Sequence, residues 1–321
     1  MKGYESMKII ESEQVYKYLT MEKCMEIMKE AFVDLETGKC IQPIRFINQL
    51  PHNNKFGFMP AYLGDNDYFG AKVITAFHSN LGTSYPSHMG YVMLFESTHG
   101  SLVGMVDATS ITQIRTGAVS GVATDLLARK DAKSLALIGA GAQARAHLES
   151  ILLVRDIKEV YVYDMKEENA KRFQQEMSEL YSVIITVKST AEEAVKGADI
   201  ICTLTPSVEP FLKAEWVKPG THINAVGTFS PNTREVTSKL VAHSKLYADS
   251  VEAMKNECGE FIIPKEEGLI DETHILGSIG EIILGKIKAR TSEDEITLFD
   301  ALGLAVEDVA CARFMCCLEE C

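Results

Sequence analysis

The run Gly139-Ala140-Gly141-Ala142-Gln143-Ala144 has the residue types and the spacing that dinucleotide binding requires. Gly139 allows a tight turn, Gly141 lets backbone amides approach a pyrophosphate, and a small residue at 144 lets the next helix pack against the preceding strand. The free N–H groups at the start of that helix favour bound phosphate without a lysine. Similar glycine turns occur in other proteins, so the motif indicates a nucleotide site only together with its surroundings.

Asp164 stands at the end of the next expected strand after this turn. A carboxylate at that point can bind the ribose hydroxyls of an adenosine, and it repels a 2'-phosphate. The following Met165 and Lys166 bring no arginine that would hold such a phosphate. The sequence therefore favours NAD(H) over NADP(H), and the alternative role of Asp164 is to cap the following helix.

Small and polar residues follow two later expected strands, in the segments Cys202–Ser207 and Asn224–Gly227. Ligands of open parallel sheets bind at the carboxyl ends of the strands, so both segments are candidates for cofactor contacts. Ordinary strand-to-loop turn chemistry explains them equally well. The residues predicted to contact the cofactor are Thr116, Gly139, Gly141, Ala142, Gln143, Asp164, Thr203, Thr205, Val226 and Gly227.

Three cations, Arg45, Lys72 and Arg115, stand among apolar or small residues. Half-buried cations need an anionic partner. A substrate carboxylate is one candidate, because arginine binds carboxylates through two parallel hydrogen bonds. An internal aspartate or glutamate is the other, and the sequence does not decide between them.

The first hundred residues have the mixed pattern of an α+β domain. An amphipathic helix is expected at Thr20–Glu36, and the polar segment 96–101 is typical of a hairpin between antiparallel strands. Strands are expected at 44–49, 55–59, 71–77, 90–96 and 102–107.

From residue 111 onwards the pattern changes to a long helix, 111–128, followed by strands that alternate with helices. This alternation predicts a parallel, doubly wound α/β sheet of the Rossmann type. The tail, 296–319, is expected to be helical. Strands are predicted at 134–138, 159–164, 183–187, 200–204, 222–226 and 245–249, and helices at 143–154, 167–180 and 191–197.

Composition limits the classes of partner. The chain has 321 residues, 46% of them hydrophobic, and a formal net charge of -13, which disfavours nucleic acid and anionic membranes as partners. Without a signal peptide or a long apolar run, the expected location is the cytoplasm. No metal is expected, because no histidine pair has metal-ligand spacing; Cys316, Cys317 and Cys321 are expected to pack on a terminal helix rather than bind a soft metal.

Seven short segments follow one another along nearly the whole chain: Pro43–Arg45, Phe58–Tyr62, Gly70–Lys72, Gln113–Ala118, Gly139–Ala144, Asn224–Gly227 and Leu298–Gly303. Together they resemble the ornithine cyclodeaminase and mu-crystallin family. The resemblance implies that residues 1–115 plus 300–321 form a substrate and dimerisation domain. A Rossmann domain for NAD, residues 116–299, would be inserted in it, and the protein would be a homodimer.

The same resemblance implies an amino- or imino-acid substrate and roles for individual residues. Arg45 and Arg115 would hold the substrate carboxylate, and Lys72 would lie beside the reacting nitrogen or carboxylate. Lys72 and Arg115 are thus the catalytic candidates. Met59 and Phe229 complete the set of expected substrate contacts.

Phe229 is the informative departure from the family pattern. Members that cyclise ornithine carry an aspartate two residues after the glycine that matches Gly227, and a phenyl ring cannot accept a proton in its place. The sequence therefore predicts an NAD(H)-dependent reductase of a cyclic imino acid, Δ1-pyrroline-2-carboxylate or Δ1-piperideine-2-carboxylate. Two alternatives stay open: an ornithine cyclodeaminase that forms L-proline and ammonia, and a non-catalytic protein that binds NAD(P)H and a ligand.

Overall fold

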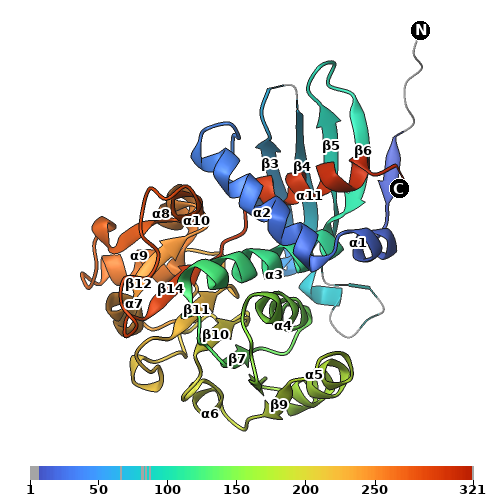
Figure 1. Ribbon diagram of the computed structural model, residues 1–321. Helices are drawn as coiled ribbons and strands as arrows, with labels where there is room; N and C mark the ends of the chain where they lie inside the picture. Colours follow the sequence, from blue (N-terminus) through green and yellow to red (C-terminus); the bar gives the residue numbers. More distant parts are fainter. Residues whose placement is uncertain (1–6, 66, 81–82, 84, 87, 320–321) are drawn as a thin grey trace. The chain divides into compact units, whose positions relative to one another are not determined.

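The computed structural model describes residues 7–65, 67–80, 83, 85–86 and 88–319, and the chain divides into two compact units (Figure 1). Unit 1 comprises Met1–Arg115 and Leu304–Cys321, and unit 2 comprises Thr116–Gly303. The first boundary falls inside helix α3 (Ala108–Leu127). At the second boundary unit 2 extends four residues beyond the expected 299, because strand β14 (Thr297–Asp300) pairs within the unit 2 sheet.

Unit 1 contains a six-stranded sheet in the order β1-β6-β5-β4-β3-β2. All neighbours are antiparallel except β1 and β6, which are parallel. The five expected strands all form, with ends shifted by a few residues, and β1 was not predicted. The strands are β1 (Lys8–Ile10), β2 (Phe46–Gln49), β3 (Lys55–Tyr62), β4 (Tyr68–Ala76), β5 (His88–Glu96) and β6 (Leu102–Asp107), with short 3-10 turns η1 (Pro51–Asn53) and η2 (His78–Asn80).

The predicted hairpin between β5 and β6 is confirmed. The Glu96 carboxylate accepts the backbone N–H groups of Thr98, His99 and Ser101 at 2.7 to 3.0 Å, and Gly100 adopts a φ of +73°. The five residues between the two strands thus make the connection by local chemistry alone, which is why the sequence pattern identified it.

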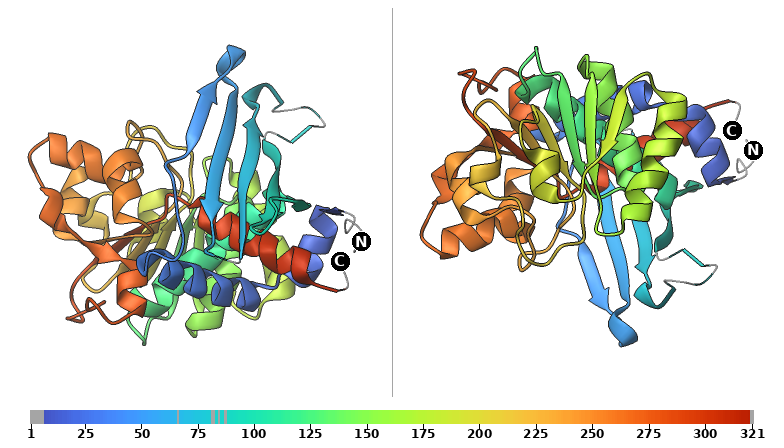
Figure 2. Two further views of the ribbon diagram at one scale, coloured as in Figure 1. Left: turned by 90° about the horizontal axis from the view of Figure 1, so that it is seen from above. Right: turned by 90° about the horizontal axis from the view of Figure 1, so that it is seen from below.

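Helix α11 (Ala305–Cys317) crosses the unit 1 sheet, and helix α2 (Met21–Glu36) lies alongside it, as Figures 1 and 2 show. Thr20 caps α2 by accepting the N–H of Lys23 at 3.3 Å. A third helix, α1 (Ser12–Tyr18), precedes α2. Because α11 has the sheet on one side and α2 on another, nearly all of its side chains are buried, including Glu307 and Asp308.

The prediction that the tail is helical from residue 296 was wrong at its start. Thr297–Asp300 is strand β14, every residue of which is buried, and the helix begins only at Ala305. A short, fully buried apolar run has no amphipathic period, so its pattern does not separate a strand from a helix.

Unit 2 is a Rossmann-type, doubly wound sheet of eight strands, all parallel, in the order β13-β12-β14-β11-β10-β7-β8-β9. This confirms the predicted fold class. The sequence did not predict β13 or four of the helices. The strands are β7 (Ser134–Ile138), β8 (Glu159–Tyr163), β9 (Ile184–Val187), β10 (Ile200–Thr203), β11 (His222–Ala225), β12 (Lys245–Ala248), β13 (Ile275–Ser278) and β14.

Separate apolar cores lie on the two faces of this sheet. One contains Leu148 of α4 and Phe173 of α5, and the other contains Leu240 of α7 and Phe261 of α9. Alternate side chains of β7 serve the two cores, which explains why the strand is buried throughout. The helices are α4 (Ala142–Val154), α5 (Glu167–Leu180), α6 (Ala191–Val195), α7 (Ser238–His243), α8 (Val251–Glu257), α9 (Gly259–Glu266) and α10 (Ile279–Ile283), with turns η3 (Ala214–Trp216) and η4 (Glu272–His274).

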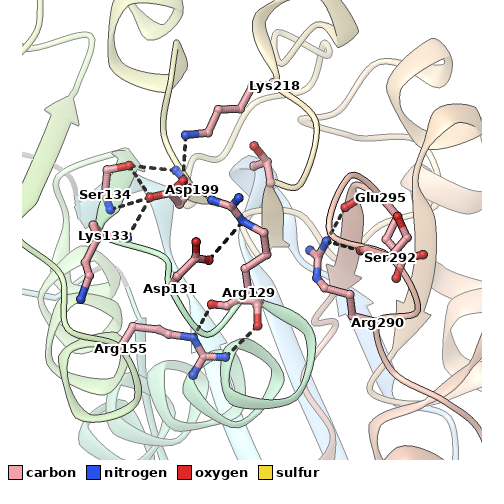
Figure 3. Close-up of polar contacts among 12 residues, drawn as sticks. Arg129, Asp131, Lys133, Ser134, Arg155, Asp199, Lys218, Arg290, Ser292 and Glu295 are labelled. Carbon is pink, nitrogen blue, oxygen red and sulfur yellow. Dashed lines mark hydrogen bonds and ion pairs between the residues drawn. The ribbon is translucent and has the colours of Figure 1, made fainter.

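A polar network built on Asp199 closes the amino ends of the central strands (Figure 3). Its carboxylate accepts the N–H groups of Lys133 and Ser134 at 2.8 and 3.1 Å, and the amine of Lys218 and the guanidinium of Arg129 lie within 2.8 Å. Burial opposes the charge of Asp199, but Lys218 and these donors lower its pKa to about 2. Since ligands of such sheets bind at the opposite, carboxyl ends, this network is structural.

Candidate active site

The glycine turn directly follows β7, and its two glycines have different reasons to be glycine. Gly139 has a φ of +100°, and a Cβ added there would lie 2.8 Å from the carbonyl oxygen of Leu204. Gly141 is the N-cap of α4 with a φ of -80°, and a Cβ added there would meet no heavy atom within 4 Å. The turn is therefore tight at Gly139 and open at Gly141, as a cradle for a pyrophosphate must be.

Asp164 follows β8 and lies beside this turn. Its Oδ2 accepts the N–H of Ala140 at 2.9 Å, and its Oδ1 accepts the N–H of Lys166 at 2.9 Å and the side-chain amide of Asn169 at 3.2 Å. The carboxylate thus ties the glycine turn to the next strand and also caps the segment that leads into α5. Each carboxylate oxygen has two lone pairs, so these contacts leave room for a ribose hydroxyl.

Arg145 is part of this site and was not predicted. Its Nη1 donates to the carbonyl oxygens of Ala140 and Gly141 at 3.1 and 2.9 Å, and its Nε donates to Glu176 at 2.9 Å. In a trans peptide the N–H points away from the carbonyl, so the amides of Gly141 and Ala142 are turned away from Arg145. The turn thus keeps these N–H donors on the side away from Arg145, available to a phosphate. A cation four residues after Gly141 on the helix was the available signal.

The segments after β10 and β11 come together through one buried side chain, Glu235. Its Oε1 accepts the N–H and the hydroxyl of Thr205 at 2.7 and 2.6 Å, and its Oε2 accepts the N–H of Gly227 at 2.9 Å. The backbone of Val226 donates to Thr203 at 3.1 Å. Thr203, Thr205, Val226 and Gly227 therefore lie together at the carboxyl ends of neighbouring strands.

Three further residues of unit 2 were predicted to contact the cofactor. Ala142 and Gln143 begin α4, immediately after the glycine turn, and Thr116 is buried in helix α3. Their contacts with a cofactor stay predictions.

In unit 1, the two buried cations Lys72 and Arg115 share the carboxylate of Asp308. Asp308 lies 2.7 Å from Nζ of Lys72 and 3.1 Å from Nε of Arg115, and Glu307 lies 2.9 Å from Nη1 of Arg115. All four side chains are at least nine-tenths buried. The internal carboxylate partners that the sequence left open therefore exist for these two cations, and α11 supplies both of them.

Burial and neighbouring charge shift the proton affinities of both cations. Burial lowers the pKa of Lys72 to about 8, with Arg115 acting in the same direction and Asp308 against it. For Arg115, burial also opposes the charge, but Asp308 and Glu307 raise its pKa above the ordinary value. Lys72 is therefore an ammonium at neutral pH that can give up its proton, whereas Arg115 is a permanent cation.

The other predicted substrate residues occupy distinct places. Met59 is buried in β3 directly opposite Lys72 of β4, so the two side chains share one face of the sheet. Arg45 is half-buried immediately before β2, and Phe229 is half exposed in the segment that follows β11. Glu307 and Asp308 were not predicted; two acids in the first turn of an otherwise apolar helix were the signal.

At the end of the chain, Cys316 is buried and Cys317 donates to the hydroxyl of Tyr68 at 3.6 Å, whereas Cys321 lies outside the described residues. In the part of the chain that the structure describes, every helix is too short or too polar to serve as a membrane span.

Comparison with known proteins places these features in one family. The model of the ornithine cyclodeaminase/mu-crystallin family matches residues 5–316. The chain is 36% identical over 313 residues to a Δ1-pyrroline-2-carboxylate reductase of Bacillus cereus, covering 96% of this chain and 95% of that protein. It is 37% identical over 279 residues to the ketimine reductase mu-crystallin of Mus musculus, covering 87% and 85% of the two chains.

Solved structures agree with the sequence relatives. A Δ1-pyrroline-2-carboxylate reductase of Thermococcus litoralis, in complex with NADH and L-proline, superimposes with a TM-score of 0.93 at 39% identity, covering 97% of this chain and 96% of that one. An archaeal alanine dehydrogenase dimer with bound NAD has a TM-score of 0.91 at 34% identity, covering 97% and 95%. The chain belongs to the ornithine cyclodeaminase/mu-crystallin family.

Proposed function

We propose that this protein is an NADH-dependent reductase of a cyclic imino acid, Δ1-pyrroline-2-carboxylate or its six-membered analogue Δ1-piperideine-2-carboxylate. The observation that carries the proposal is Phe229. In this family the matching aspartate handles the proton and nitrogen chemistry of ornithine cyclisation, and a phenyl ring cannot. Relatives named as pyrroline-2-carboxylate and ketimine reductases, at 36% and 37% identity, support the reductive reaction.

The cations of unit 1 fit a substrate that carries one carboxylate. Arg115 is a permanent cation, and an arginine can hold a carboxylate through two parallel hydrogen bonds. Arg45 brings a second guanidinium immediately before β2. Arg45 and Arg115 hold the carboxylate in this proposal, and Met59 and Phe229 pack against the apolar ring.

The imine nitrogen must carry a proton, because an iminium accepts a hydride more readily than a neutral imine. Lys72 supplies or retains that proton: its ammonium is buried, and burial lowers its pKa to about 8, close to the working pH. NADH, when bound, supplies the hydride. The balanced reaction consumes one imino acid, one NADH and one proton, and it yields the cyclic amino acid and NAD+.

The cofactor in this proposal is NAD(H) rather than NADP(H). Asp164 brings a carboxylate to the adenosine side of the glycine turn, where it repels a 2'-phosphate. Solved relatives that bind NADH and NAD agree with this preference.

We also propose that the protein is a cytoplasmic homodimer. Four large apolar side chains around β2 and β3 are at least 40% exposed in a single chain: Ile41, Ile44, Phe46 and Phe58. Clusters of this kind mark protein interfaces. The related archaeal alanine dehydrogenase is a dimer.

Purified protein given NADH and each of the two cyclic imino acids should oxidise NADH and form proline or its six-membered homologue. The absorbance of NADH follows the reaction, and amino-acid analysis identifies the product. L-Ornithine with catalytic NAD+ serves as the comparison reaction and should release no ammonia. Ammonia and proline from ornithine, with no reduction of either imine, would replace this proposal by ornithine cyclodeaminase.

A further inference from the structure

Three segments meet at the carboxyl ends of neighbouring strands of unit 2: the glycine turn after β7, the segment after β10 and the segment after β11. They pack tightly against one another at two glycines. A Cβ added to Gly139 would lie 2.8 Å from the carbonyl oxygen of Leu204, and one added to Gly227 would lie 2.1 Å from that of Thr205. Small shifts of one segment are therefore transmitted to the next.

Glu235 joins two of these segments. It is fully buried, and its carboxylate accepts three hydrogen bonds, from the N–H and hydroxyl of Thr205 and from the N–H of Gly227. The bond to Gly227 closes the loop 227–235, which carries Phe229. All three partners are donors, so the site requires a group with acceptors on both sides, which is what a carboxylate provides.

The backbone of Glu235 is itself held from two sides. Its N–H donates to Oε1 of Glu260 at 2.7 Å, and its carbonyl oxygen accepts the N–H groups of Phe211 and Leu212, both at 2.9 Å. These hydrogen bonds hold the backbone of Glu235 in place, and its carboxylate extends from there to the two segments. Burying a carboxylate is costly, and apolar residues would fill such a space at lower cost.

The strand order shows which half of a dinucleotide these segments face. In a Rossmann sheet the adenosine half lies over the strand on one side of the glycine turn, here β8 with Asp164. The nicotinamide half lies over the strands on the other side, here β10 and β11. The hydrogen bonds of the Glu235 carboxylate to Thr205 and Gly227 connect the segments at the nicotinamide half.

We propose that Glu235 is a positioning residue: it holds the Thr205 and Gly227 segments at the spacing that the nicotinamide half of NADH requires, and it holds the loop that carries Phe229. This inference rests on the proposed use of NADH. Without the carboxylate the two segments would have to be ordered when the cofactor binds, and that ordering would reduce affinity.

Glu235→Gln tests the proposal, because glutamine has nearly the same volume but places an NH2 group against one of the donors. We expect the dissociation constant of NADH to rise about ten-fold, as for the loss of a charge-assisted hydrogen bond. The dissociation constant of ADP-ribose, which lacks the nicotinamide, should change less than about two-fold. Titration calorimetry measures both ligands on protein shown to be folded by circular dichroism.

Asp199→Asn is the matched control. Asp199 is also a buried carboxylate of unit 2 that accepts two backbone N–H groups and a hydroxyl, but it lies at the amino ends of the strands. It should lower thermal stability and leave both dissociation constants unchanged. If Glu235→Gln does not fold, Glu235→Asp, which keeps the charge but is too short to reach both segments, is measured in the same way.

Two results would overturn the inference: unchanged affinity for NADH in the folded variant, or equal losses for NADH and ADP-ribose. Failure of the proposed function is distinguishable from either, since it would appear in the unaltered protein as binding of NADH without reduction of an imino acid.

Discussion

At the scale of single residues, the proposed chemistry depends on how the two buried cations of unit 1 are balanced. Asp308 contacts both Lys72 and Arg115, so neither cation is a free charge waiting for a substrate. A substrate carboxylate would add to an ionic cluster that is already nearly neutral. Its affinity then depends on the whole cluster rather than on one arginine.

The pH dependence of the reaction should report Lys72. Because burial lowers its pKa to about 8, kcat/KM for the imino acid should be level below that pH and fall above it, as the ammonium loses its proton. In Lys72→Arg the guanidinium does not titrate, so a descending limb near pH 8 should be absent. An identical limb in both proteins would assign it to the substrate or to another group.

The lowered pKa of Lys72 also makes the stability of the fold depend on pH. The unfolded chain holds the Lys72 proton up to about pH 10, whereas the folded chain releases it near pH 8. Between these values the unfolded state binds more protons, so the contribution of Lys72 to the free energy of unfolding increases with pH. Comparing Lys72→Met with the unaltered protein by urea unfolding across this range isolates that contribution.

Removing Arg115 should be costly to the fold as well as to catalysis. In Arg115→Met, the buried carboxylate of Glu307 loses its cation and Asp308 keeps only Lys72. We expect the free energy of unfolding to fall by about 3 to 5 kcal/mol, measured by urea denaturation. Lys23→Met, which breaks the exposed pair of Lys23 and Glu26, is the control and should cause no measurable change. Equal changes in the free energy of unfolding would show that burial does not make the Arg115 ion pairs more important than the exposed pair.

At the scale of elements, the carboxyl ends of the unit 2 strands are built by contacts between loops rather than within them. Asp164 links the glycine turn to the end of β8, Arg145 of α4 holds two of its carbonyl groups, and Glu235 links the ends of β10 and β11. The rigid sheet supplies the spacing, and a few polar side chains fix the loops upon it.

Substitution of the two glycines of the turn should have different effects: one should lower stability, and the other should weaken NADH binding. Gly139→Ala places a side chain at a φ of +100° and against the Leu204 carbonyl, so it should lower the free energy of unfolding by more than about 1 kcal/mol. Gly141→Ala meets no protein atom and should change stability by less than about 0.5 kcal/mol. Its methyl group would nevertheless occupy the space expected for the pyrophosphate, and it should raise the dissociation constant of NADH about ten-fold or more.

Chemical denaturation and NADH titration of both variants check this pair. Unchanged NADH affinity in Gly141→Ala would place the pyrophosphate somewhere other than at this turn.

At the scale of the whole molecule, the property to test is the assembly of two chains into a dimer. The exposed apolar side chains of β2 and β3 would be unusual on a monomer, and a net charge of -13 keeps the rest of the surface soluble. We propose that a second copy of the chain covers this apolar surface.

Phe46→Asp should convert the proposed homodimer into monomers, because a charge replaces a phenyl ring that is 60% exposed in the single chain. Sedimentation velocity measures the change. Leu180→Asp is the matched control: Leu180 is 68% exposed at the end of α5 in unit 2, and its replacement should leave the assembly intact. If Phe46→Asp sediments as the unaltered protein does, this face is not the interface.

The sequence by itself determined those features that depend on local patterns. The glycine turn, the alternation that leads to a parallel sheet, the hairpin on either side of Gly100 and the position of Asp164 all depend on residues close together in the chain. In each case the residue types and the apolar period within a short segment favour one local conformation. The departure at Phe229 also required no structure, since it is a matter of residue type.

Only the tertiary structure decided the partners of the charged residues. Lys72 of β4 and Arg115 of α3 meet Asp308 of α11, and Glu235 reaches Thr205 and Gly227. The same limit applies to β14, whose buried run is compatible with a strand or a helix until its neighbours are known. Electrostatic and packing energies depend on distance in space, and residues far apart in the chain come close only through the order of the strands.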